Sequence, residues 1–551
     1  MPSENNTIND WTIMFFFASD MELSPLTVSQ IKAVKDAGYQ ETTDVFLYFD
    51  SNEPGVPTRL FNVNKSLKKA SKNRTRIGDG ADPYVRSFLN DEIMPDDMIT
   101  AKGKCTGTLK QKLTEPDSMN ATDALWNFLG YCQENSPAKH YLLFLVGHGM
   151  VVANDTFLYD EHPRSSITLN DFGDLIRRFT KSISETGTLE LLGLHSCSMS
   201  SIEVAYELRD TARYMIASEG YSYVGSWPYR QLLKKIFNTT QNPEGKPLDE
   251  LIQSIYELTL YNAPDFAYSG YSHDLTLCSL DGKKIARLVE RLHQLTGNLK
   301  DSLKTDRGEQ LILLAHLKSQ AFWRDEYTDI YDFCRCLKVI CDVTDASQNE
   351  LAKACQDVMD DLEQRPDGLI VLSDNFGWQY QYAHGLSIYF PWIRPLGDEE
   401  TGPFSKYQSY AFNSDFSGHT WDTFLEEYWI KTMRASEPDN EAQEKTMRAP
   451  EDRASEKEFE RTEFDGIMEV RPSNLGFPSN PVGAYNKPGG GYNKPGGSMA
   501  ESPCICPSIK NFPQTVKLNR RVRKVSATPG IMPAFNPTDE SSERGRSRPE
   551  E

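Results

Sequence analysis

A cysteine and a histidine in this chain each follow a short apolar run, and together they could carry out nucleophilic chemistry. His148 lies between two glycines directly after the run 141–146, and Cys197 comes shortly after the run 189–194. A thiol beside an imidazole can act as nucleophile and general base. With backbone N–H groups nearby, such a pair is equipped for acyl transfer, so the pattern predicts a cysteine-nucleophile enzyme.

The residues after Cys197 predict an activated thiol. Ser200 and Glu203 have the spacing of a helix capping box, so a helix is expected to begin just after the cysteine. A thiol at a helix N-terminus has a lowered pKa and is therefore more often a thiolate. The glycines that flank His148 permit close approach of the backbone.

Other residues could also carry out chemistry, and they raise two questions: the role of His195 and the presence of a metal site. His195, two positions before Cys197, points to the same side of its strand and could line a pocket or replace His148 as the base. The Cys-x-Cys pairs at 334–336 and 504–506 lack the spacing of zinc ligands. We therefore expect no metal site and no cofactor.

The elements that must position these residues follow from the apolar pattern. Strands are expected at 12–17, 44–49, 141–146, 189–194 and 214–217, with helices at 26–37, 121–135, 169–179 and 200–211. This alternation predicts an α/β fold with a parallel sheet and helices on both faces. In such a sheet the chemistry gathers at the carboxyl ends of the strands, where His148 and Cys197 lie.

Composition divides the chain into three predicted parts. Residues 1–228 form the catalytic core, with a polar insertion at about 51–115, and residues 229–432 form a mostly helical C-terminal subdomain. Residues 433–551 are rich in Pro, Gly, Ser and charged residues, and the sequence Tyr-Asn-Lys-Pro-Gly-Gly occurs there twice. Such a segment buries too little apolar surface to offset its ordering entropy, which predicts a disordered tail.

The charge balance narrows the choice of partner. With 59 Lys and Arg against 79 Asp and Glu, the net charge of −20 argues against nucleic acid as the main partner. No run reaches the roughly 18 apolar residues of a membrane span. The ten scattered cysteines fit a reducing compartment, and the run 13–18 is too short for a signal peptide. These features predict a cytoplasmic protein whose tail could dock a protein partner.

Several segments resemble the clostripain family of cysteine peptidases, which belongs to the caspase-like clan. The likeness covers about residues 10–430 and has the order strand, Gly-His-Gly, helix, strand, Cys, helix. It is carried by the segments 11–20, 197–208, 217–219, 225–229, 331–333 and 385–391. The resemblance implies a caspase-like parallel-sheet core and an endopeptidase that acts on proteins or peptides.

The resemblance also implies roles for particular residues. His148 would be the general base and Cys197 the nucleophile, and the backbone N–H groups of Gly149 and Cys197 would form the oxyanion hole. It implies a preference for Arg or Lys at P1, with a substrate pocket formed by His195, Glu219, Trp227 and Asp20.

The chain departs from the family at two pocket positions. His195 and Pro228 stand where the family usually has Asp. Asp20 or Glu219 could supply the missing countercharge for a basic P1 residue. Without a carboxylate partner, a buried Arg side chain would be costly.

Some family members are activated by cleavage between the histidine and the cysteine, and some bind calcium. Arg164 is the first candidate for self-cleavage here, followed by Arg178 and Lys181. The chain has no clear calcium-loop signature. Two other functions stay open: a non-catalytic caspase-like scaffold or regulatory protein, and a transferase that uses the same dyad.

Overall fold

The structure, a computed structural model, describes residues 8–19, 24–38, 40–51, 58–63, 119–150, 155–161, 164–241, 248–262, 271–344 and 349–436. All of these residues belong to one compact unit within Met1–Pro507. Most of the predicted insertion at 51–115 and of the predicted tail lies outside the described residues. The three predicted domain boundaries therefore stay predictions.

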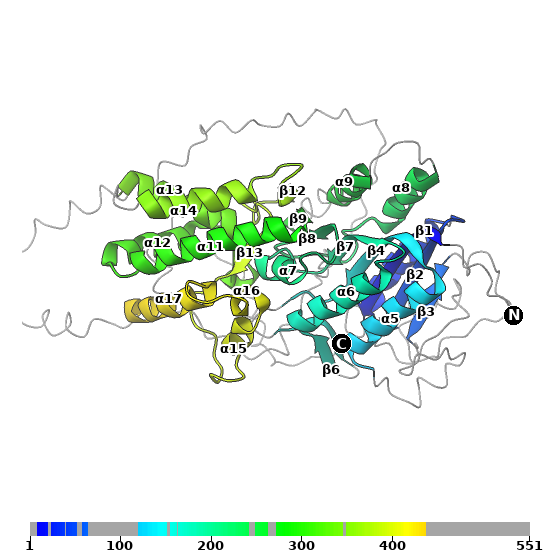
Figure 1. Cartoon of the computed structure of the whole chain (residues 1–551), viewed down its shortest axis with the longest axis horizontal. Coiled ribbons are helices and arrows are strands. Elements are labelled where there is room, and N and C mark those ends of the chain that lie inside the picture. Colours follow the sequence, from blue (N-terminus) through cyan, green and yellow to red (C-terminus); the bar gives the residue numbers. More distant parts are fainter. Residues whose placement is uncertain are drawn as a thin grey trace, which may run out of the picture. The chain divides into compact units, whose positions relative to one another are not determined.

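An eight-stranded sheet forms the centre of the fold (Figure 1), with the strand order β12-β9-β8-β7-β4-β1-β2-β3. The five strands from β8 to β2 are parallel, whereas β3, β9 and β12 pair antiparallel to their neighbours. The strand bounds are β1 Asn9–Ser19, β2 Thr43–Ser51, β3 Arg59–Asn62, β4 Ala138–Val146, β7 Thr188–His195, β8 Tyr214–Ala217, β9 His273–Ser279 and β12 Ile370–Phe376.

Two smaller sheets accompany the main one. The first has the order β10-β11-β13, and the second is the hairpin β5-β6. Their bounds are β10 Ala321–Phe322, β11 Tyr327–Asp329, β13 Ser387–Tyr389, β5 Phe157–Glu161 and β6 Arg164–Ile167. The hairpin includes Arg164, the first candidate for self-cleavage.

Helices connect and cover the strands. Those that alternate with the parallel strands are α1 Ser24–Asp36, α5 Ala121–Asn135, α6 Leu169–Ile183 and α7 Ile202–Glu207. The later ones are α8 Tyr229–Gln241, α9 Leu248–Leu260, α11 Gly282–Ser302, α12 Asp306–Lys318, α13 Ile330–Thr344, α14 Asn349–Leu362, α15 Pro403–Gln408, α16 Ala411–Ser414 and α17 Trp421–Ser436. Residues 323–325 form a short 3-10 helix.

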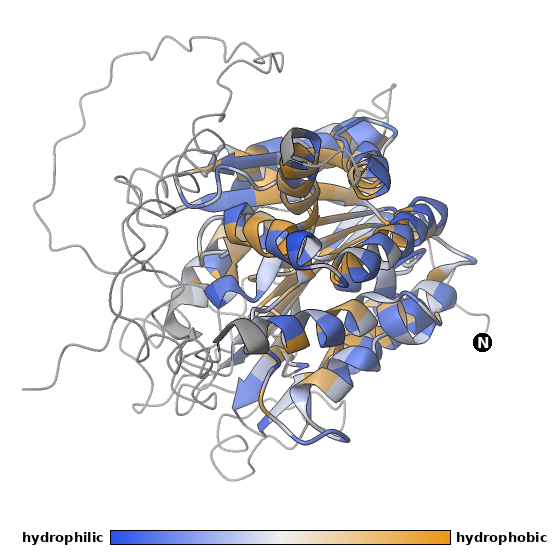
Figure 2. Cartoon of the chain, turned by 90° about the vertical axis from the view of Figure 1, so that its left-hand side faces the viewer, coloured by the Kyte–Doolittle hydropathy of each residue, from blue (hydrophilic) through white to orange (hydrophobic). Residues whose placement is uncertain are grey.

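The two faces of the sheet are both covered because alternate side chains of a strand point to opposite faces. Phe15 and Phe17 of β1 pack against Tyr229 at the start of α8, whereas Phe16 packs against Phe128 of α5. Figure 2 shows the consequence, with apolar strands between helices whose polar sides face outward. The core strands are therefore apolar on both sides, as buried parallel strands require.

The predicted fold class is confirmed: the structure has an α/β core with a mostly parallel sheet and a largely helical C-terminal part. Two strands from that later part, β9 and β12, continue the main sheet beyond β8. The remaining helices α11 to α14 pack on one another, with α17 against α11 (Figure 1). Among the described helices, none combines the length and apolarity that crossing a membrane requires.

Candidate active site

The predicted dyad residues leave neighbouring strands at the same level. Strands β4 and β7 pair in parallel, and their register places Val146 opposite His195. His148 follows Val146 by two residues, and Cys197 follows His195 by two residues. The strand pairing therefore brings the histidine loop and the cysteine turn to one edge of the sheet, as the sequence predicts.

The two loops are also in direct contact beyond the strand ends. A Cβ atom added at Gly149 would lie 1.8 Å from the carbonyl oxygen of Cys197, which is a severe steric clash. The backbone N–H of Met150 donates to Sδ of Met199 at 3.3 Å. Only a glycine permits this approach, so Gly149 has the backbone proximity that an oxyanion hole with Cys197 requires.

Cys197 is disulfide-bonded in this structure. The side chain of Cys197 is buried, with 1% of its surface exposed. The backbone N–H of Ser222 donates to its sulfur at 3.3 Å. The nucleophile must therefore be reduced before it can attack a substrate.

The expected helix N-terminus at the cysteine is wrong in detail. The helix α7 begins at Ile202, and its N-cap is Ser201, whose side chain accepts from the N–H of Val204. A turn with a positive φ of 56° at Ser198 separates Cys197 from this helix. The helix therefore does not begin at the sulfur, and its dipole is no explanation for a lowered thiol pKa.

The two residues of the predicted capping box have other partners. The hydroxyl of Ser200 donates to the carbonyl oxygen of Gly385 at 2.6 Å. Oε1 of Glu203 accepts from the N–H of Tyr389 at 2.9 Å and from the hydroxyl of Tyr407 at 3.0 Å. Burial raises the pKa of Glu203 above its usual value. Both residues join the cysteine turn to the segment 385–389 rather than to the helix end.

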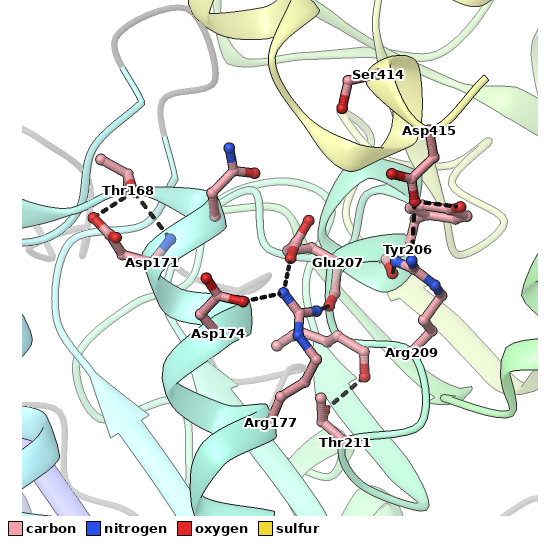
Figure 3. Close-up of polar contacts among 12 residues, drawn as sticks. Thr168, Asp171, Asp174, Arg177, Tyr206, Glu207, Arg209, Thr211, Ser414 and Asp415 are labelled. Carbon is pink, nitrogen blue, oxygen red and sulfur yellow. Dashed lines mark hydrogen bonds and ion pairs between the residues drawn. The ribbon is translucent and has the colours of Figure 1, made fainter. Parts of the chain in front are cut away.

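Ion pairs fix α7 against its neighbours (Figure 3). Arg177 of α6 reaches across to Glu207 at the end of α7 and also pairs with Asp174. Arg209, just after α7, pairs with Asp415 at 3.0 Å. Glu207 has 3% of its side chain exposed, so its carboxylate depends on Arg177 as a countercharge. These pairs hold the short helix that follows the cysteine turn.

His195 is buried, and both of its ring nitrogens have hydrogen-bond partners. Its Nδ1 lies 2.8 Å from the hydroxyl of Tyr229, and its Nε2 lies 2.9 Å from the carbonyl oxygen of Tyr223. Its ring stacks on that of Trp227, and both side chains are buried. Burial lowers the pKa of His195 to about 3. The ring is therefore neutral, and neither it nor Trp227 presents a surface to a substrate.

Glu219 is directed into a buried acidic cluster. Its Oε2 accepts from the N–H of Gly385 at 2.9 Å, and its side chain lies against Asp329 and Asp274. Burial, together with the charges of Asp329 and Asp274, raises the pKa of Glu219 well above its usual value. The raised pKa disfavours the charged form of Glu219, and its predicted role as the countercharge for a basic P1 side chain stays a prediction.

Asp274 is the second member of this acidic cluster. It lies on β9, and 1% of its surface is exposed. Burial raises the pKa of Asp274 to about 7, although hydrogen bonds from the N–H groups of Glu219 and Gly220 oppose the shift. Each of the three carboxyl groups of the cluster accepts hydrogen bonds from backbone N–H groups, which offset part of the cost of burial.

The other candidates are Asp20 for the substrate pocket and three basic residues for self-cleavage, and the role of Asp20 stays a prediction. Asp20 is outside the described residues. Arg164 is exposed but is the first residue of strand β6. It lies opposite Glu161 of β5 in the hairpin register, so it belongs to a strand and not to an open loop. Arg178 and Lys181 belong to helix α6. The bonds after these three residues are thus held in regular structure.

Three residues near the cysteine were missed by the sequence analysis: Ser222, Asp274 and Tyr380. Asp274 is brought there because β9 pairs with β8 in the main sheet. Tyr380 is brought there because the segment 377–385 packs against the segment 218–222. No motif in the sequence signals either event. The nearest available signal was the segment 217–219, whose likeness to a family pocket loop marked the right loop but not its partners.

The neutral state of His195 predicts a pH-dependent contribution to stability. Its folded pKa of about 3 lies below the unfolded value of 6.5, so the unfolded chain binds an extra proton between them. Stability is therefore lost as the pH falls below about 6.5, at up to about 1.4 kcal/mol per pH unit for this group. The variant His195→Gln lacks this component, so its denaturation free energy should depend less on pH.

Urea titrations of the wild type and of His195→Gln at several pH values measure the difference. The buried His273 and His316 contribute equally to both chains and cancel from the comparison. A difference that does not change with pH would mean that His195 titrates normally and is not held neutral.

Comparisons with known proteins identify the family of this chain. The clostripain family matches residues 29–429, which is more than half of the chain. Clostripain of Hathewaya histolytica is 21% identical over 430 residues, which cover 71% of this chain and 76% of that protein.

Solved structures of C11 proteases are also similar. A secreted C11 cysteine protease from Bacteroides thetaiotaomicron, in complex with an irreversible peptide inhibitor, is 14% identical with a TM-score of 0.46, over 75% of this chain and 100% of that one. An inactive zymogen C11 protease from Parabacteroides distasonis is 16% identical with a TM-score of 0.41, over 75% and 99%. By its family match, this chain belongs to the clostripain family and is a cysteine endopeptidase.

Proposed function

We propose that this chain cleaves peptide bonds with Cys197 as the nucleophile and His148 as the general base. The observation that carries the proposal is the contact between the two loops at the ends of β4 and β7, where Gly149 abuts the backbone of Cys197. This contact leaves the side chains of positions 148 and 197 on adjoining loops. A base beside a thiol is the arrangement that nucleophilic catalysis requires.

The steps follow from these positions. After reduction of its disulfide, Cys197 loses its proton to His148 and attacks the substrate carbonyl carbon. The N–H groups of Gly149 and Cys197 bind the resulting oxyanion, and His148 returns the proton to the leaving amine. Water, activated by His148, then hydrolyses the acyl-enzyme and restores the thiol.

We further propose that the P1 side chain is uncharged. The family position for an acid is taken by His195, which is neutral and buried, and burial together with Asp329 and Asp274 raises the pKa of Glu219. His195 therefore carries no negative charge, and the charged form of Glu219 that a buried Arg or Lys would require is disfavoured. This proposal replaces the basic P1 preference that the family resemblance implies.

We expect the reaction to need no metal ion. Within the described parts of the chain, no group of three or more His, Cys, Asp or Glu is arranged to hold one. A calcium requirement stays a prediction by family likeness, and the assay in the presence and absence of a chelator tests it. The cytoplasmic location and a partner for the tail also remain predictions.

A non-catalytic scaffold is the competing function, since a family pocket acid is absent at His195. The dyad prediction separates the two functions. After treatment with a thiol reductant, Cys197→Ala and His148→Ala should each lose at least about 10³-fold in kcat on peptide substrates. The double variant should be no worse than either single variant, because the two residues act as one unit.

Matched variants provide the controls. His140→Ala removes a histidine from the other end of the same strand, and Cys336→Ala removes a half-buried cysteine outside the site. Both should retain wild-type kcat. Full activity in Cys197→Ala would overturn the proposed chemistry, and a wild type without any Cys197-dependent activity would favour the scaffold.

The P1 proposal predicts both substrate choice and processing. In peptides that differ only at P1, an uncharged residue should be cleaved on the order of 10²-fold better than Arg, the cost of an unpaired buried charge. The purified wild type should also remain uncut after Arg164. This bond lies at the start of β6, where the hydroxyl of Ser165 accepts from the N–H of Ala121 at 3.0 Å.

Mass spectrometry of the wild type beside Cys197→Ala and Arg164→Gln checks the processing. Fragments that meet at Arg164 in the wild type only would show self-cleavage after a basic residue. That result would contradict the uncharged P1 and restore the family preference.

A further inference from the structure

Four consecutive backbone N–H groups, from Glu219 to Ser222, are all engaged by side-chain acceptors. The N–H groups of Glu219 and Gly220 donate to the two oxygens of Asp274, at 2.6 and 3.0 Å. The N–H of Tyr221 donates to the hydroxyl of Tyr380 at 3.1 Å. The fourth N–H, that of Ser222, donates to the sulfur of Cys197 at 3.3 Å.

The same segment is bound on its other side to the cysteine turn. The carbonyl oxygen of Gly220 accepts from the N–H of Ser198 at 3.0 Å, and that of Ser218 accepts from the N–H of Ser200 at 2.9 Å. The segment 218–222 therefore lies between the nucleophile turn and the two side chains that hold its N–H groups. Any displacement of the segment would move the Ser222 N–H relative to the sulfur.

Packing restricts the segment further. A Cβ atom at Gly220 would lie 2.4 Å from the ring of Tyr380, so only glycine admits this ring. Asp274 is anchored on β9, which pairs with both β8 and β12 inside the main sheet. The hydroxyl of Ser218 also donates to the backbone carbonyl of Asp274 at 2.8 Å. Asp274 thus lies on a strand of the main sheet, whereas Tyr380 lies in the turn region between β12 and β13, where its ring packs on Gly220.

We propose that Asp274 and Tyr380 are positioning residues that hold the segment 218–222 so that the Ser222 N–H stabilises the thiolate of Cys197. This inference rests on the proposed nucleophilic role of Cys197. A donor aimed at a buried sulfur favours its charged form, because water cannot reach the site to do so. The Ser222 N–H would thus favour the thiolate of Cys197, a role that the sequence analysis gave to a helix N-terminus. The helix α7 begins only at Ile202.

Two variants test the proposal by removing one acceptor each. Asp274→Asn keeps the size of the side chain but turns an amide NH₂ toward one of the two backbone donors. Tyr380→Phe keeps the ring against Gly220 and removes only the hydroxyl. In the reduced full-length chain, both should slow alkylation of Cys197 by iodoacetamide and raise the apparent pKa of its thiol, measured from the pH profile of that reaction.

Peptide cleavage provides the second readout. We expect kcat of Asp274→Asn to fall on the order of 10²-fold, the loss that a displacement of about 1 Å at a reacting group can cause. KM should change much less, because the segment acts on the nucleophile. Tyr380→Phe should show a smaller loss in the same direction, since it only removes an acceptor, whereas Asp274→Asn removes one and also turns an amide donor toward a backbone N–H.

The control is Asp374→Asn on the neighbouring strand β12. Asp374 lies opposite Leu275 in the β9-β12 pair and accepts from the hydroxyl of Tyr256 at 3.2 Å, away from the segment 218–222. It should leave the alkylation rate and kcat unchanged. Thermal melting of all variants shows which are folded.

The outcomes separate this inference from the proposed function. The positioning role alone is overturned if the wild type is active and both Asp274→Asn and Tyr380→Phe are folded and have the alkylation rate and kcat of the wild type. If Asp274→Asn does not fold, Tyr380→Phe decides by the same criterion. A wild type whose activity does not depend on Cys197 overturns the proposed function, and the inference falls with it.

Discussion

The parallel pairing of β4 with β7 is the constraint on which the site depends. Its register, with Val146 opposite His195, ends both strands at one level and brings their following loops into contact. A shift of this register by one residue would turn each side chain to the other face of the sheet. Glycine at position 149 then allows the backbones to meet, because any Cβ there would overlap Cys197.

Exclusion of water shapes the chemistry behind these strand ends. Burial keeps the ring of His195 neutral, and burial together with nearby carboxylates raises the pKa of Glu219. The acid Asp274 is tolerated there because two backbone donors face it. These buried residues are the basis on which we propose an uncharged P1 residue and a backbone donor as the source of thiol activation.

Local pattern sufficed for the fold class and for placing His148 and Cys197 just after two neighbouring strands. The apolar runs ending near His148 and Cys197 are long enough to be buried strands, and buried parallel strands gather their ends at one edge. The same reasoning failed where a tertiary partner decides. Ser200 and Glu203 have the spacing of a capping box, but their side chains form hydrogen bonds with the segment 385–389 instead of capping the helix. The hairpin β5-β6 was missed because its strands are short and irregular in pattern.

The most direct test of the central claim is to locate a covalent adduct on the nucleophile. The reduced chain is treated with a peptide chloromethyl ketone bearing an uncharged P1 residue, and the modified cysteine is mapped by mass spectrometry. The adduct should form on Cys197 in the wild type and in His140→Ala, and should be strongly reduced in His148→Ala. An adduct on another cysteine, or equal labelling of Cys197 without His148, would contradict the assignment of this pair.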